Sequence, residues 1–262
     1  MRKTSLFLLP LFVATLTLPA AETRARVDAF EKNIARDYTR DGLLTEGVFN
    51  AEGRRAGDLS CGRNAMLTAF YAAAEAYRFK ATGEAAARAK LQQNLAALAT
   101  LARVTGVPHL PAVSFRRGAN LPAGWPRTPD GNTAWLPGSA KELRSFLLAV
   151  LFAGTALDEC GLLLDSDEGR ILVDGYLLPV AHEMKESGGL LRNLGRKELP
   201  EVSFSPLMKG IPLPLLAPQA LFQVAWFGLT ARATGDPAWR DYADELLEKK
   251  GFGRIIVDNR RL

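Results

Sequence analysis

Two short segments, far apart in the chain, share one pattern that constrains the fold more than any other feature. The first runs Tyr77-Arg-Phe-Lys-Ala-Thr-Gly-Glu84, and the second runs Leu229-Thr-Ala-Arg-Ala-Thr-Gly-Asp236. A glycine that follows a helical run adopts the left-handed conformation at low cost, and an acidic residue after it suits the start of a new helix. Each segment therefore predicts a tight corner between two antiparallel helices, and the recurrence predicts a repeated α/α architecture.

The N-terminus has the composition of an export signal. Two cations precede an apolar run from Leu6 to Leu18, and small residues follow at Ala20 and Ala21. This pattern predicts a secretory signal peptide over residues 1–21, and therefore a periplasmic or secreted protein. An uncleaved anchor is the alternative. The remaining residues, 22–262, are enough for a single domain with a large core, and none of their segments is expected to span a membrane.

The periodicity of apolar residues predicts an all-α domain with almost no sheet. The expected helices span residues 24–41, 64–82, 84–105, 139–160, 166–185, 217–234 and 236–250. The second, fourth and sixth of them contain long uncharged stretches, and we expect these three to be buried on all sides. The helices between them have one apolar face and one charged face, as surface helices do.

The connections alternate in length. They are short within each predicted hairpin and long between hairpins, where they span residues 43–63, 106–138 and 186–216. Successive turns of antiparallel helices lie at opposite ends, so we expect all long loops at one end. Loops of this length are uncommon in compact domains unless they are functional. The arrangement predicts an incomplete α/α toroid of about seven helices, with an ordinary irregular helical domain as the alternative.

A ring this incomplete should leave apolar surface on its inner helices. We expect such surface near Phe70 or Phe222. Contiguous exposed apolar patches normally mark an interface. We therefore expect self-association, or that the chain is a fragment of a longer protein.

Several motifs carry a resemblance to a known group of proteins. They are Asn64-x-x-Leu67-x-Ala69, Tyr77-Arg78-x-x-x-Thr82-Gly83, Val104-Thr-Gly106-Val-Pro108, Trp135 and Thr234-Gly-Asp-Pro237. In these pieces the chain resembles secreted bacterial proteins of the six-hairpin glycosidase-like, or α/α-toroid, group. The resemblance implies a glycan-related role with a cleft at the long-loop end. The chain departs from the group's pattern at Arg63, where an acid is usual, and at Val113, where an arginine is usual. Glu142 stands near the position of the group's acid.

The three long loops contain most of the excess positive charge, and aromatic residues lie among the cations. Positive clefts attract anionic ligands, and flat rings stack on sugars or on arginine. The candidate ligand-binding residues are Arg63, Asn64, Arg116, Arg117, Trp125 and Trp135. The sequence therefore predicts an exported domain that binds or processes a polysaccharide at its long-loop face. The alternative is a non-catalytic envelope or protein-interaction domain of the same fold.

If the protein is an enzyme, two chemistries are open. Glycoside hydrolysis needs two carboxylates, and the candidates are Glu142 with Asp58 or Asp130. Glu142 has a structural interpretation too, as a helix-start acid with Ser139 as the N-cap. A polysaccharide lyase would need a base near cations, and His109 is the candidate.

Other functions are disfavoured by the composition. The net charge of +5, two units of which belong to the signal peptide, is too small to indicate nucleic-acid binding. The two histidines and two cysteines have no metal-site spacing, so we expect neither a metal nor another cofactor. Cys61 and Cys160 are predicted at opposite ends of the helices, roughly 30 Å apart, so we expect no disulfide between them.

Overall fold

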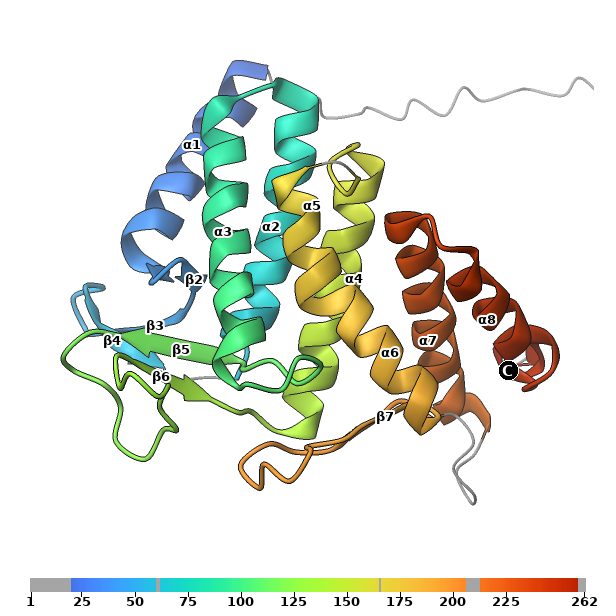
Figure 1. Cartoon of the computed structure of the whole chain (residues 1–262). Helices are drawn as coiled ribbons and strands as arrows, with labels where there is room; N and C mark the ends of the chain where they lie inside the picture. The colour runs from blue at the N-terminus through green and yellow to red at the C-terminus, as the bar shows by residue number, and fades with distance from the viewer. Residues whose placement is uncertain (1–19, 60–61, 165, 206–212, 259–262) are drawn as a thin grey trace, which may run out of the picture. The chain divides into compact units, whose positions relative to one another are not determined.

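The computed structural model describes residues 20–59, 62–164, 166–205 and 213–258 (Figure 1). The chain divides into two compact units, Met1–Asp37 and Tyr38–Leu262. The predicted signal peptide lies outside the described residues except for its last two, Ala20 and Ala21.

The described part of the first unit is one helix, α1 (Ala20–Asp37). It starts and ends four residues before the predicted helix 24–41. Its surface carries ion pairs one turn apart, between Arg26 and Glu22 at 2.7 Å and between Arg24 and Asp28 at 3.3 Å. Such exposed pairs stabilise a helix only slightly.

The second unit is mostly helical. Its helices are α2 (Asn64–Thr82), α3 (Ala85–Val104), α4 (Ala140–Glu159), α5 (Asp167–Leu172), η1 (Val173–Leu177), α6 (Leu178–Ser187), α7 (Leu213–Thr234), α8 (Pro237–Glu248) and α9 (Phe252–Asp258). The predicted bounds of α2, α3, α4 and α8 are correct to within two residues, and α5, η1 and α6 form the single helix expected over 166–185. α7 begins four residues earlier than predicted, and α9 was not predicted. The η1 segment is π-helical, which the sequence did not indicate.

The two glycine corners form as predicted. Gly83 and Gly235 both have φ of 68°, and their backbone N–H groups bond to Phe79 O at 2.8 Å and Ala231 O at 2.9 Å. The acid of the second corner, Asp236, is the N-cap of α8 and accepts a hydrogen bond from Ala238 N at 2.9 Å. The paired motifs therefore mark helical hairpins.

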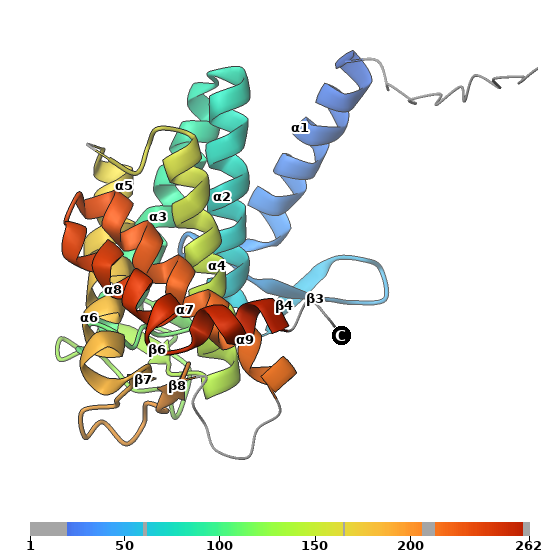
Figure 2. The ribbon, with the colours of Figure 1, turned by 90° about the vertical axis from the view of Figure 1, so that its right-hand side faces the viewer.

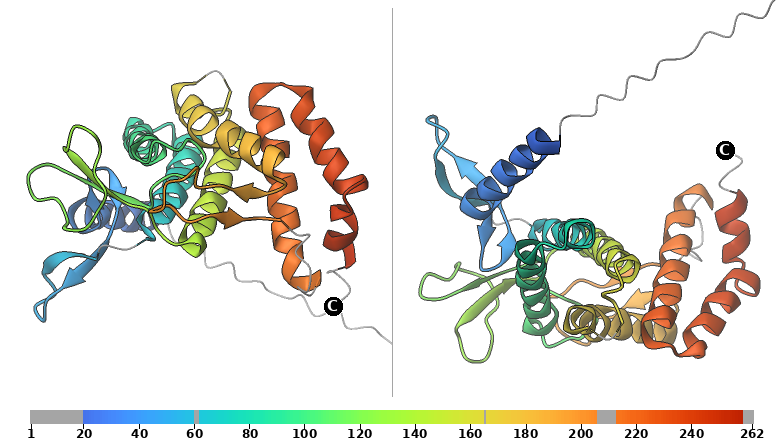
Figure 3. Two further views of the ribbon diagram at one scale, coloured as in Figure 1. Left: turned by 60° about the horizontal axis from the view of Figure 1, so that its bottom comes forward. Right: turned by 90° about the horizontal axis from the view of Figure 1, so that it is seen from above.

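All the short turns lie at one end of the helices and the long loops at the other, as expected. In Figure 1 the α2–α3, α4–α5 and α7–α8 turns are at the top, while the connections that follow α3 and α6 are at the bottom. Seen from above in Figure 3, α2 and α4 lie side by side in one layer and α3 and α5 in a second. In Figure 2, α9 turns away from the end of α8 and lies against α7.

The long loops contain short antiparallel strand pairs that the sequence did not predict. They are β1–β2 (Thr39–Arg40 and Leu43–Leu44), β3–β4 (Glu46–Phe49 and Arg55–Leu59), β5–β6 (Ser114–Arg117 and Thr133–Leu136) and β7–β8 (Leu190–Leu191 and Val202–Ser203). Each pair stands alone in its loop, so the strand content stays small and the fold remains dominated by helices.

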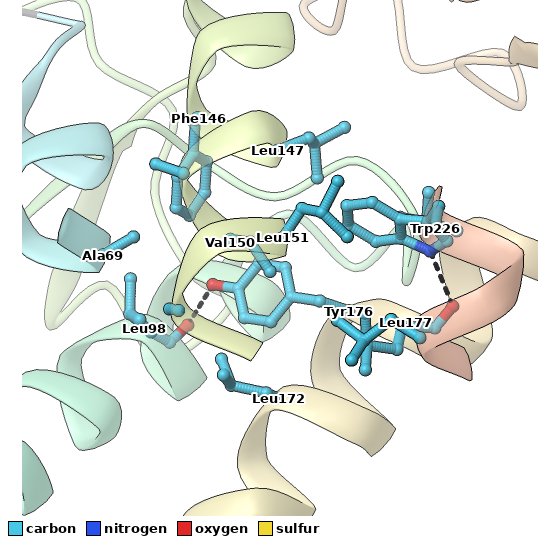
Figure 4. Close-up of a cluster of buried hydrophobic side chains, with 14 of the residues drawn as sticks. Ala69, Leu98, Phe146, Leu147, Val150, Leu151, Leu172, Tyr176, Leu177 and Trp226 are labelled. Carbon is cyan, nitrogen blue, oxygen red and sulfur yellow. Dashed lines mark hydrogen bonds between the residues drawn. The ribbon is translucent and has the colours of Figure 1, made fainter. Parts of the chain in front are cut away.

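Two buried polar groups connect the helices across the core (Figure 4). The Tyr176 hydroxyl of η1 donates to Leu98 O of α3 at 2.5 Å, and the Trp226 indole N–H of α7 donates to Leu177 O at 3.0 Å. The Tyr176 ring also packs edge-on against Phe146 of α4 at 5.6 Å. Because both polar atoms have partners, these large side chains are buried without an unpaired donor.

The helices expected to be buried on all sides have an exposed apolar face instead. Phe70 of α2 and Phe152 of α4 contact each other at 5.7 Å, and both are exposed, as are Leu148 of α4 and Leu221 of α7. The apolar surface expected near Phe70 is therefore present, whereas Phe222 is buried.

Cys160 ends α4 and is a free thiol. Its predicted distance from Cys61 stays untested because Cys61 lies outside the described residues. Among the helices that the structure describes, none is long and apolar enough to cross a membrane.

Candidate functional site

Glu142, the first candidate acid, holds the start of α4. Its Oε2 accepts hydrogen bonds from the Ser139 backbone N–H at 2.7 Å and from the Ser139 hydroxyl at 2.8 Å. Ser139 Oγ in turn accepts from Glu142 N at 3.3 Å, which completes a capping box. Ser139 is thus the N-cap, as predicted. The Glu142 carboxyl also lies against Gly62, where an added Cβ would be 1.9 Å from Oε1.

The other two candidate acids lie on different loops. Asp130 is exposed in the β5–β6 connection and accepts hydrogen bonds from Thr128 Oγ1 at 2.5 Å and from Asn132 N at 3.1 Å. These bonds lower the pKa of Asp130, so it is held as a carboxylate that shapes its own turn. Asp58 pairs with Gly47 in the β3–β4 ladder, and its side chain lies outside the described part. No hydrogen bond connects Glu142 with Asp130.

His109, the candidate base, is buried rather than exposed. Its Nε2 lies 2.7 Å from Arg192 O, and its Nδ1 lies 3.8 Å from Oε2 of Glu183 on α6. Glu183 is buried and accepts hydrogen bonds from Arg192 Nε at 2.5 Å and Arg192 N at 3.2 Å. Burial raises the pKa of Glu183, but the hydrogen bonds from Arg192 outweigh it, and the net shift of the pKa is downward. This cluster attaches the β7 loop to α6.

Two of the candidate ligand-binding residues at the start of α2 have structural partners. Asn64 is fully buried, and its side chain donates to Ser114 Oγ of β5 at 3.0 Å. Arg63 is exposed and forms an ion pair with Glu46 of β3 at 2.6 Å. Both residues join the strand pairs to the helices.

Arg116 and Trp135 are buried and therefore unavailable to a large ligand. Arg116 of β5 is 6% exposed, and burial together with nearby cations lowers its pKa. Trp135 of β6 is 0% exposed, and its indole nitrogen has no hydrogen-bond partner among the described residues. Of the predicted aromatic and cationic groups in this hairpin, Arg117 stays exposed and Trp125 is half-buried.

Three cations from separate segments lie near the C-terminal turns of α3. Arg117 donates to Thr100 Oγ1 at 2.8 Å and lies over the Phe115 ring at 5.0 Å. Arg103 lies one turn further along α3. The Arg196 Nη1 atom, from the β7–β8 connection, is 3.6 Å from where a Cβ on Gly106 would lie, and Arg196 Nε forms an ion pair with Glu198 at 2.6 Å.

Two adjoining hollows of about 290 and 240 Å³ lie between the end of α3 and η1. Both are lined by Arg103 of α3 and by Asp174 and Gly175 of η1, and the larger one also by Arg170. Neither the Arg103 side chain nor the Asp174 side chain forms a hydrogen bond or ion pair with another described residue. We call this region the α3–η1 groove. It offers hydrogen-bond donors and an acceptor to a ligand, and π-helical segments such as η1 are frequent at functional sites.

The sequence analysis missed Arg103 and Asp174 because both lie well inside predicted helices, whereas its candidates lie in the long loops or at helix starts. Arg103 could have been considered as a candidate from the sequence, because it lies at the end of a predicted helix that leads into a long loop. For Asp174 there was none, because the π-helical turn depends on tertiary packing.

No group of three or more potential metal ligands occurs in the part of the chain that the structure describes. Comparisons with protein-family models, with curated proteins and with solved structures found no match.

Proposed function

We propose that this chain is an exported, non-catalytic domain that binds an anionic polysaccharide in the α3–η1 groove. The observation that carries the proposal is that Arg103 and Asp174 line both hollows with side chains that have no partner among the described residues, while Arg117 and Arg196 lie near the same end of α3. Cations attract a polyanionic chain, and a carboxylate accepts hydrogen bonds from sugar hydroxyls.

The contacts of the candidate catalytic groups favour binding without turnover. Among the described residues, every hydrogen bond of the Glu142 carboxylate goes to Ser139, and the Asp130 carboxylate bonds only within its own turn. His109 is buried beside Glu183 and a backbone carbonyl. Hydrolysis needs two carboxylates that face one substrate, and in the described part no hydrogen bond joins Glu142 with Asp130 or either of them with His109. We further propose that the helical hairpins follow the path of an incomplete α/α toroid.

The test is a titration of the purified protein with alginate, a polyuronate, and with neutral dextran. The triple variant Arg103→Gln, Arg117→Gln, Arg196→Gln should weaken alginate binding at least tenfold. The matched control Lys32→Gln, Arg240→Gln, Lys249→Gln also removes three exposed cations, and it should change the affinity less than twofold. Equal losses in the two triple variants would show non-specific attraction and contradict the site.

Asp174→Asn separates a shaped site from simple charge attraction. Removing a negative charge should strengthen binding if attraction alone operates. In the proposed groove the same change removes a charged acceptor for sugar hydroxyls, so binding should weaken. Release of shorter products from alginate, abolished by Glu142→Gln, would contradict the non-catalytic part of the proposal.

A further inference from the structure

A second and larger hollow lies away from the α3–η1 groove, between α4 and α7. It has a volume of about 490 Å³, which is within the range of small-molecule sites. Its apolar lining includes Leu148 and Phe152 of α4 and Leu221 and Phe222 of α7. We call it the α4–α7 groove.

The groove has a rigid floor and an open apolar rim. On the floor, Phe222 stacks on Phe204 at 4.2 Å and contacts Trp226 at 5.2 Å. On the rim, Phe152 and Leu221 are each 56% exposed. Large apolar side chains that stay exposed together around a concave surface are typical of a ligand site.

Two side chains beside this apolar surface have polar atoms with no partner among the described residues. Arg144 of α4 lines the groove, and its guanidinium forms no hydrogen bond or ion pair with any described residue. Gln219 of α7 lines it as well, and its buried Oε1 accepts no hydrogen bond from the described part of the chain. A guanidinium next to apolar surface is suited to a carboxylate, which it can bind through two hydrogen bonds.

We propose that the α4–α7 groove binds a single-chain amphiphile with a carboxylate head and a hydroxyl near that head. The alkyl chain lies on Phe222 and between Phe152 and Leu221. Arg144 binds the carboxylate, and the Gln219 carbonyl oxygen accepts a hydrogen bond from the hydroxyl. The charge on Arg144 favours this occupant over a neutral one. The site is independent of the glycan proposal, because the two grooves share no lining residue.

Calorimetric titration with three probes of equal chain length tests the proposal. The purified protein should bind dodecanoate more tightly than dodecan-1-ol, and 3-hydroxydodecanoate more tightly than dodecanoate. Arg144→Gln should weaken dodecanoate binding about tenfold and leave dodecan-1-ol unchanged. Arg240→Gln, an exposed arginine on α8, is the control and should change neither. Gln219→Leu should remove the advantage of the hydroxyl.

Leu148→Asp should abolish binding of all three probes, because it places a charge in the groove. Since Leu148 is 44% exposed, the variant should fold, and Leu164→Asp at an exposed position outside the groove controls for this. Unchanged dodecanoate affinity in Arg144→Gln would overturn the proposal. A dimer would also overturn the proposal if sedimentation shows that it binds no probe and that Leu148→Asp dissociates it. In that case a second copy of the chain would occupy the groove.

Discussion

Gly62→Ala should destabilise the protein by disturbing the start of a helix that lies elsewhere in the sequence. The three atoms nearest to an added Cβ all belong to the Glu142 carboxyl, at 1.9, 2.1 and 2.7 Å. The carboxyl must move, and it then loses its hydrogen bonds to Ser139 at the start of α4. Gly62 has no positive φ, so the backbone itself accepts alanine.

The expected free energy follows from two opposing effects. Loss of a helix cap costs about 0.5–2 kcal/mol. Replacing glycine by alanine at a compatible backbone position stabilises by about 0.4–1 kcal/mol through the unfolded state. Taken at the middle of both ranges, the net loss should be about 0.5 kcal/mol, or roughly 1–2 °C in Tm for a domain of this size.

A double-mutant cycle isolates the mechanism. In a Glu142→Ala background the obstructing carboxyl is absent, so Gly62→Ala should there be neutral or stabilising. Urea denaturation followed by far-UV circular dichroism measures all four proteins. Gly57→Ala, where an added Cβ has nothing within 4 Å, is the control and should not destabilise in either background. The same loss from Gly62→Ala with and without the Glu142 carboxyl would refute the reasoning.

Three further predictions concern packing and pH. Gly169→Ala should destabilise the protein strongly, because the added Cβ would lie 2.0 Å from Leu163 O. Gly228→Ala in α7 has open space around the added Cβ and should stabilise the protein by about 0.5–1 kcal/mol. Thermal unfolding of both variants checks this, and similar changes in Tm would contradict it. Tyr176→Phe should cost about 1 kcal/mol in urea denaturation because the bond to Leu98 O is lost, and a neutral result would show that this bond contributes nothing. Burial raises the pKa values of Glu168 and Glu183, but their hydrogen bonds to Arg88 and Arg192 outweigh it, so both pKa values are lowered. The stability that these two carboxylates contribute is therefore present above about pH 4.3 and is lost as the pH falls through their folded-state pKa values. Glu168→Gln and Glu183→Gln should each flatten the acid side of the stability profile, and an unchanged slope would contradict the assignment.

The helices were predictable because their signals are local. The bounds of α2 were correct to the residue, since a largely apolar run precedes Gly83 and a left-handed glycine ends a helix. Ser139 and Glu142 likewise predicted the start of α4 from four residues. The π-helical turn of η1 had no such signal, because the position of Tyr176 against α3 and α4 depends on tertiary packing.

The strand pairs and the site could not be predicted in the same way. β5 and β6 are four residues each and pair across a connection of 15 residues, so neither shows a convincing alternation. His109 was expected to be a loop residue, yet it is buried because Glu183, far away in the sequence, provides its partner. Arg116 and Trp135 were expected to contact ligand, but both are buried, on opposite faces of the β5–β6 pair.

The uncharged composition of the inner helices predicted burial, and the structure leaves part of that surface open in the α4–α7 groove. The energetics show why a cation belongs there. Burying about half of an 11-carbon chain contributes roughly 4 kcal/mol at about 0.8 kcal/mol per CH₂ group, which alone corresponds to millimolar affinity. A charge-assisted hydrogen bond from Arg144 adds about 1.5–3 kcal/mol. The affinity should then reach about 10–100 μM, and the difference between dodecanoate and dodecan-1-ol measures the contribution of Arg144 directly.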